Sequence, residues 1–227
     1  MTGFKRAGWG VAVSLVGAVA VGCSQAGFGE SANLPQDKHA SLVANFSQGQ
    51  PLSLPSDTGF NLHDTQRHAS GKGKAISSAD PAGRASCQAD ADGVGAATAE
   101  FQLGYVLDNR GTDPLDVTAD LKVSYSCEVQ GNPDEPAKEP DHLGLRVFVR
   151  DSNHRILRSM VLTEVTPFNG PRRWSSQQNP TFDFTMEPGL AYYIVLAGRT
   201  AVTGTESNSA SARVDVQSTA LDLYPRN

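Results

Sequence analysis

The 227-residue chain has few cysteines, and their spacing excludes two common kinds of site. Its three cysteines, Cys23, Cys87 and Cys127, form no Cys-x-x-Cys pair and have no histidine beside them. A zinc finger or a dithiol redox motif would need such a spacing. The chain also lacks a Gly-x-Ser-x-Gly motif and a phosphate-binding glycine loop, so it carries no recognisable enzyme signature.

Basic residues are scarce relative to acidic ones. The chain has 19 Lys and Arg against 24 Asp and Glu, which gives a net charge of −5. Lys5 and Arg6 contribute +2 and no acid precedes Cys23, so the part from Cys23 onward carries −7. A nucleic-acid-binding protein needs a basic face to neutralise phosphates, and electrostatic docking on anionic lipid needs one too. The charge balance therefore argues against both kinds of partner.

No apolar run reaches the roughly 20 residues that a membrane-spanning helix needs. The longest, Ala7–Val21, follows Lys5 and Arg6 and ends in small residues just before Cys23. This arrangement resembles the signal sequence of bacterial prolipoproteins, in which the cysteine is lipidated and becomes the mature N-terminus. The resemblance implies that residues 1–22 are a signal peptide. It also implies a lipid on Cys23 that anchors the protein in the bacterial cell envelope, with the mature domain outside the cytoplasm.

Residues 23–96 are rich in Ser, Gly, Gln, Asn, Asp and Ala. Their large apolar residues show neither sustained alternation nor a helical stripe, and their acids and bases balance. A segment of this kind cannot bury enough apolar surface to offset the entropy lost on ordering. We therefore expect residues 23–96 to form a lipid-anchored, flexible, low-complexity tether.

The pattern changes near Ala97, where apolar and polar residues begin to alternate. The clearest run is 115–129, with Leu, Val, Ala, Tyr and Cys on one face and Asp, Thr, Lys, Ser and Glu on the other. The last run changes phase between Val216 and Leu221, which indicates a β-bulge. Seven strands are expected, at 101–107, 115–129, 143–149, 156–165, 181–186, 191–199 and 212–224. With no helical pattern, residues 97–227 are predicted to form one antiparallel β-sandwich.

One local motif gives this sandwich a more specific likeness. Met186, then Pro188-Gly189, then Tyr192 is similar to the tyrosine-corner stretch of fibronectin type III and related immunoglobulin-like domains. The resemblance implies an all-β, immunoglobulin-like fold. It also implies a structural role for Tyr192, whose hydroxyl would hydrogen-bond back across the corner.

Once Cys23 is assigned to the lipid, Cys87 and Cys127 remain as a pair. In an exported chain such a pair predicts a structural disulfide. It would close a loop of about 40 residues and stabilise the fold by roughly 4 kcal/mol. The alternation places Cys127 on the core side of its strand, which favours this interpretation over a reactive thiol or a metal ligand.

Metal and cofactor sites find little support in the sequence. Gln88–Gly93 is similar to part of an EF-hand calcium loop, but its first ligand would be an amide and its twelfth position is Ala99. A polar turn leading into a strand explains it better. The five histidines are dispersed along the chain. We expect no metal, no cofactor and no catalytic residue.

The long loop predicted at 166–180 is the better candidate for contact with a partner. Phe168, Arg172, Arg173 and Trp174 lie there between turn-forming residues, and aromatic residues and arginine are enriched at binding hot spots. The alternative is that the two aromatic side chains cap the end of the sandwich while the arginines remain solvated.

The function predicted is that of an envelope lipoprotein whose sandwich binds an envelope protein or a glycan without catalysis. Sandwiches of this kind are mostly binding or spacer modules. Two alternatives stay open. One is a metal-dependent or hydrolytic enzyme with its site in the loops, and the other is a purely structural spacer.

Overall fold

The computed structural model describes residues 51–55, 59–131, 141–168 and 170–226. These residues form a ten-stranded antiparallel sheet. No helix among them is long and apolar enough to cross a membrane. The predicted signal peptide, the lipidation site at Cys23 and the first part of the predicted tether lie outside the described residues.

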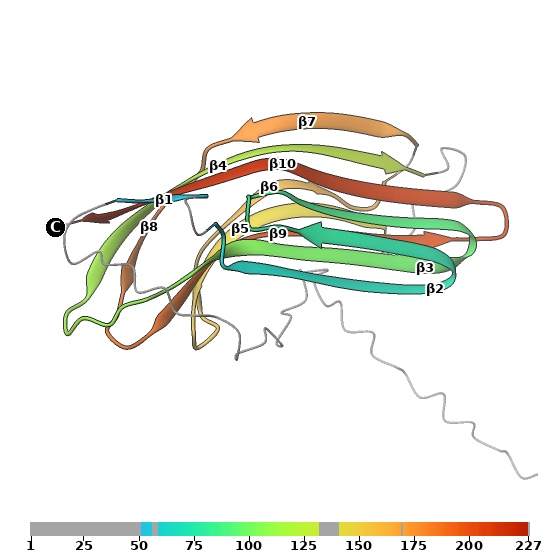
Figure 1. Ribbon diagram of the computed structural model, residues 1–227. Helices are drawn as coiled ribbons and strands as arrows, with labels where there is room; N and C mark the ends of the chain where they lie inside the picture. The colour runs from blue at the N-terminus through green and yellow to red at the C-terminus, as the bar shows by residue number, and fades with distance from the viewer. Residues whose placement is uncertain (1–50, 56–58, 132–140, 169, 227) are drawn as a thin grey trace, which may run out of the picture. The chain divides into compact units, whose positions relative to one another are not determined.

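The strands are spread over almost the whole described chain (Figure 1). In chain order they are β1 (Leu52–Leu54), β2 (Leu62–Ala79), β3 (Ala85–Asp108), β4 (Leu115–Gln130), β5 (His142–Asp151), β6 (Ile156–Val165), β7 (Arg172–Gln178), β8 (Thr181–Met186), β9 (Ala191–Gly204) and β10 (Ser209–Arg226). The all-β, antiparallel class is confirmed. The strand count is larger than the seven predicted, because β1, β2 and β7 were not expected.

The tether prediction is wrong for the described residues that precede residue 97. β1, β2 and the first half of β3 all lie inside the range 23–96 that was assigned to it. The strands there are built on small residues: Cys87, Ala89 and Ala91 alternate with polar neighbours and are at most 1% exposed. Alanine offers little apolar surface, so a search for large apolar residues missed a genuine core-facing strand. The sandwich therefore begins with β1 rather than at residue 97.

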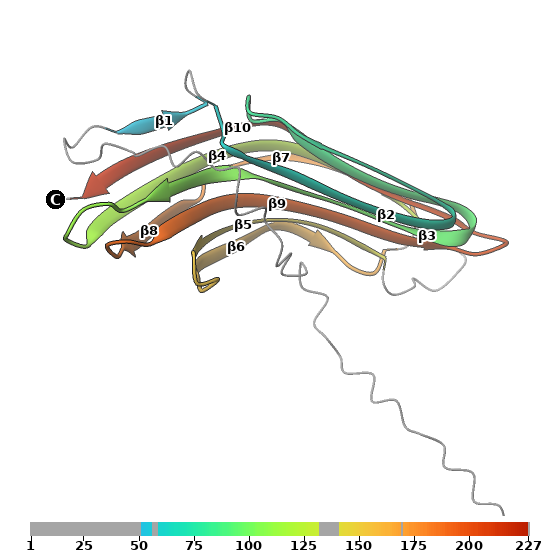
Figure 2. The same cartoon turned by 60° about the horizontal axis from the view of Figure 1, so that its bottom comes forward.

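The sheet folds over on itself into two layers (Figures 1 and 2). In the first, here the β10 layer, the strand order is β2–β3–β10–β4, with β7 and β8 end to end along β4 and β1 beside the end of β10. In the second, the β9 layer, the order is β2–β3–β9–β5–β6. β2 and β3 belong to both layers. Residues 85–92 of β3 pair with β10, and residues 95–108 pair with β9.

The two layers join at a corner where several chain segments turn together, at the right-hand end of Figure 1. Pairing continues on both sides of the turn, since Gly95 lies opposite Gly204 and Asp92 lies opposite Ser209. β2 keeps its pairing with β3 through the same turn, with a register shift between Gly71 and Gly73. The corner is thus a continuous ladder bent over the end of the sandwich.

Glycine at this corner is required by the closeness of the backbones. A Cβ atom on Gly95 would lie only 2.6 Å from the backbone N of Lys72 and from the backbone O of Ser70. Gly93, beside it, has a φ of 97°, a conformation that L side chains rarely adopt. The turn therefore depends on residues without side chains.

The core fills the space between the two layers. The largest side chains with less than 2% of their surface exposed come from both, and include Tyr105, Tyr125, Tyr192, Phe101, Leu143, Met186 and Ile194. The β-bulge predicted in the last strand is confirmed by a shift in the β10–β4 register between Val216 and Ser218. The shift lets both Val216 and Leu221 point into the core, although they are an odd number of residues apart.

Hydrogen bonds tie the two layers together on the side away from the β2 edge. The hydroxyl of Tyr125, on β4, donates to the carbonyl oxygen of Leu162, on β6, at 3.0 Å. The side-chain amide of Gln178, on β7, donates to the same carbonyl at 2.8 Å and to the Tyr125 hydroxyl at 2.8 Å. One edge carbonyl of β6 is therefore held by the opposite layer.

We predict that Gly95→Ala destabilises the fold, because the new methyl group would overlap the β2 backbone. Overpacking against backbone that cannot move away costs about 2 kcal/mol or more. For a domain of this size that lowers the Tm by roughly 4–8 °C, measurable by thermal denaturation.

The matched control is Gly189→Ala. Gly189 has a φ of 76° but no atom within 4 Å of an added Cβ, so only backbone strain of about 1 kcal/mol should result. A Gly95→Ala variant as stable as the parent chain would contradict the close approach at the corner.

Candidate functional site

The four residues predicted to form a partner-binding loop do not form one surface. Arg172, Arg173 and Trp174 lie on strand β7, paired with β4, rather than in a loop. Phe168 is 4% exposed and belongs to the core. The prediction of a single exposed cluster of these residues is therefore wrong.

Strand alternation explains how the remaining three residues separate. Trp174 lies opposite Cys127, a core-facing residue, and packs partly buried against the core. The guanidinium of Arg172, on the same face of β7, lies 4.8 Å from the centre of the Trp174 ring. Arg173 points the other way, to the outer face of the β10 layer. Of the predicted four, only Arg173 reaches that open surface.

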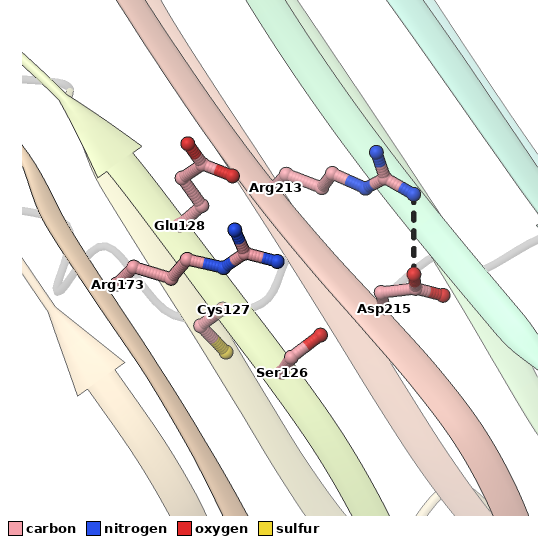
Figure 3. Close-up of a pocket in the computed structure, with 6 residues that line it drawn as sticks. All are labelled: Ser126, Cys127, Glu128, Arg173, Arg213 and Asp215. Atoms are coloured by element: carbon pink, nitrogen blue, oxygen red, sulfur yellow. Dashed lines mark hydrogen bonds and ion pairs between the residues drawn. The ribbon is translucent and has the colours of Figure 1, made fainter.

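Arg173 lines a shallow hollow on this outer face (Figure 3). The hollow has a volume of about 100 Å³, and its other lining residues are Ser126, Cys127, Glu128, Arg213 and Asp215. They come from three neighbouring strands, β7, β4 and β10. Sequence reasoning missed Ser126, Glu128, Arg213 and Asp215. Alternation alone marks them as outward-facing, but only the strand order places them together.

The register places one carboxylate between two guanidinium groups. Glu128 of β4 lies opposite Arg173 of β7 on one side and opposite Arg213 of β10 on the other. Arg213 forms an ion pair with Asp215 at 3.1 Å, the one ion pair that Figure 3 marks. Within the described part of the chain, Arg173 and Glu128 have no ion-pair partner. The hollow thus offers a free cationic fork and a free carboxylate side by side.

Other polar residues of this face pair with each other across β4 and β8. Across β4 and β8, the hydroxyls of three threonines donate to three carboxylates, Thr118 to Asp183 at 2.6 Å, Thr181 to Asp120 at 2.7 Å and Thr185 to Asp116 at 2.6 Å. These cross-strand pairs stabilise the sheet.

Cys87 and Cys127 are free thiols, so the predicted disulfide is absent. β10 lies between their strands: Cys87 is opposite Val214, and Val214 is opposite Cys127. Two strand spacings separate the Cα atoms by about 9–10 Å, beyond the roughly 7 Å that a disulfide can span. Both thiols do face the core, as predicted for Cys127, but on strands that are not neighbours.

Tyr192 makes the hydrogen bond that its motif implied. Its hydroxyl accepts from the backbone N–H of Glu187 at 2.6 Å, and its ring is 1% exposed. Burial raises the pKa of this hydroxyl. The bond fixes the turn between β8 and β9, which is a structural role.

The described residues bring together no group of three or more His, Cys, Asp or Glu side chains that could hold a metal ion. Gln88–Gly93, the partial calcium-loop motif, lies within strand β3. His142 is 3% exposed, and burial lowers its pKa, with Arg199 acting in the same direction and Glu164 against it.

Neither protein-family models nor curated proteins provide a match to this chain. Among solved structures, it is similar to a carbohydrate-binding module of the β-sandwich superfamily, at 11% identity and a TM-score of 0.27, over 79% of this chain and 61% of that one. An arabinose-bound MgGH51 α-L-arabinofuranosidase matches at 12% identity and a TM-score of 0.19, over 70% and 23% of the two chains. A structure of the infectious bursal disease virus Gx strain matches at 7% identity and a TM-score of 0.20, over 78% of this chain and 41% of that one. At these TM-scores the similarities assign no function to the chain.

We predict that Cys87 and Cys127 stay reduced and unreactive in the folded protein. Burial raises the pKa of the Cys127 thiol to about 12, and raises that of Cys87 as well, so almost no thiolate forms near neutral pH. In a Cys23→Ala chain kept free of reductant, a thiol-reactive dye should label neither cysteine when native and both after unfolding. If the unfolded chain is not labelled and its mass is lower by two hydrogens, Cys87 and Cys127 are joined by a disulfide and the prediction is wrong.

Proposed function

We propose that the protein is a lipid-anchored bacterial envelope protein whose β-sandwich binds a protein partner without catalysis. The anchor rests on the N-terminal pattern, a basic start, an apolar run and then Cys23. The partner contact is the hollow on the outer face of the β10 layer. The observation that carries this assignment is the Arg173 guanidinium, which faces an open hollow with no ion-pair partner among the described residues.

The size of the hollow favours a macromolecular partner. Pockets that enclose small molecules usually measure about 300–1,000 Å³. At about 100 Å³ the hollow is too small for that, and it is suited to receiving one or two side chains from another surface.

The charges of the hollow favour a protein over a nucleic acid or an anionic lipid. Arg173 and Arg213 are balanced by Glu128 and Asp215, so the lining has no net charge. A partner that presents an acidic and a basic side chain at matching positions would satisfy both signs, and complementary charges of this kind mainly set specificity and association rate. Arginine forks bind carboxylates in two-point geometry, which adds directionality.

We predict that Arg173→Ala combined with Arg213→Ala weakens partner binding. Charge-assisted hydrogen bonds contribute about 1.5–3 kcal/mol each, so losing one from each arginine should raise the Kd at least roughly 100-fold. The measurement is capture from envelope extract by the tagged chain, followed by titration calorimetry with the purified partner. Arg158→Ala, on the exposed face of β6, is the matched control and should leave the Kd unchanged.

Three outcomes of this experiment would overturn parts of the proposal. Equal recovery of every partner by the parent chain and the double variant would exclude the hollow as the partner-binding site. Retention of the chain on purified envelope polysaccharide, with no protein captured, would replace the protein partner by a glycan. Conversion of an envelope polymer or peptide by the purified chain would replace binding by catalysis.

We predict that Cys23→Ala releases the protein from membranes, because the lipid is the proposed attachment. The substitution replaces only the thiol group of Cys23 by hydrogen and changes no residue of the sandwich. Fractionation of cells should move the variant from the membrane pellet to the soluble envelope fraction, while Ser24→Ala stays membrane-bound. Continued attachment of the Cys23→Ala variant would contradict the anchor.

A further inference from the structure

Two rows of outward-facing side chains cross the outer face of the β10 layer at the hollow (Figure 3). Each row takes one residue from β7, β4, β10 and β3, in that order. The first row is Arg173, Glu128, Arg213 and Gln88. The second row is Ser175, Ser126, Asp215 and Ser86. Charges of opposite sign therefore lie on adjacent strands in the middle of this face.

The charged side chains of these rows are open to solvent. Those of Arg213 and Asp215 are 51% and 39% exposed, although they form an ion pair at 3.1 Å. Glu128 and Arg173 are exposed as well, and the described residues supply neither with an ion-pair partner. All four charges are thus accessible to another surface.

The same charges are complementary to a second copy of this face. The matching two-fold axis runs between β4 and β10, parallel to both strands. Rotation about it lays β10 of one copy over β4 of the other. Glu128 then faces Arg213 of the second copy, and Arg213 faces the second copy's Glu128. A two-fold interface always repeats its contacts in this way, so one charge pair forms twice.

The remaining members of the two rows are compatible with the same rotation. Arg173 faces Gln88 of the second copy, and Ser126 faces its Asp215, so each pair joins a hydrogen-bond donor to an acceptor. Ser175 faces the second copy's Ser86, and these small side chains let the two sheets approach to the roughly 10 Å of face-to-face packing. No like charges face each other in the two rows.

Neighbouring positions of the axis do not give this match. An axis between β7 and β4 leaves Arg213 with no strand opposite it. An axis between β10 and β3 places Glu128 opposite Ile76 of β2, which carries no charge. Charge complementarity therefore selects the axis between β4 and β10.

We propose that the protein forms a two-fold homodimer through this face, with Glu128 of each copy bound to Arg213 of the other. The inference rests on the proposed function, because it names a second copy as a partner of the same hollow. The overlap is four strands wide and as long as the seven residues of β7, a flat area of about 440 Å². Standard interfaces bury about 800 Å² per partner, so the dimer is weak and is favoured where an anchor concentrates the copies.

Charge reversal tests this dimer in the purified chain carrying Cys23→Ala. Sedimentation velocity over a range of chain concentrations gives the dimer Kd. Glu128→Arg sets two arginines against each other at both repeats of the contact, and Arg213→Glu does the same with two carboxylates. We expect each change alone to raise the Kd at least roughly 100-fold. An equimolar mixture of the two variants restores both charge pairs and should again form dimers.

The mixture also serves as the control for folding, because it associates only if both variants are folded. Thermal denaturation of each variant gives an independent check. Arg158→Glu, on the exposed strand β6, changes the charge by the same amount and should leave the Kd unchanged.

Three results would overturn the proposal. The parent chain may be monomeric at every concentration, which would exclude a second copy as the partner. A dimer whose Kd is changed by neither reversal would place the contact on another face. Two folded variants that do not associate when mixed would contradict the proposed charge pair. Capture of a different protein from envelope extract, lost with Arg173→Ala and Arg213→Ala, would still uphold the hollow as the binding site in each case.

Discussion

The structure depends on the close backbone approach at the corner between its two layers. There β2, β3 and the β9–β10 connection turn together, and Gly95 sits too near the β2 backbone to carry a side chain. Because strand pairing continues through the turn, the layers are one sheet and their spacing is fixed by the same ladder that holds each of them. β10 begins its pairing with β3 at this corner, and β4 and then β7 are paired outward from β10.

The central position of β10 accounts for both the chief correction and the chief candidate site. By entering between β3 and β4, it separates Cys87 from Cys127 by a full strand. The same insertion brings Arg213 and Asp215 beside Glu128, whose other neighbour is Arg173. The position of β10 thus keeps the two cysteines too far apart for a disulfide, and it also brings together the charged residues that line the hollow.

Alternation of large apolar residues was a reliable guide to single strands, and it predicted β4, β5 and the bulge in β10. It failed where strands are built from alanine, as at Ala89 and Ala91, since these bury little surface yet pack the narrow space near the corner. It also failed for Trp174, because a short edge strand flanked by prolines resembles a loop in sequence. Side-by-side placement of strands is a property of topology, so neither the hollow nor the separation of the cysteines could be deduced from local pattern.

The order of the strands along the chain has a consequence for the timing of folding. β10 is the last strand of the described chain, yet it occupies the middle of its layer, between β3 and β4. A chain that emerges gradually from a ribosome has no strand that can join β3 to β4 until β10 arrives. Its long-range pairing then forms late and all at once, which is the behaviour of slow-folding β proteins. Until that moment, the β10 layer cannot close, although β2, β3, β9, β5 and β6 can already pair with one another.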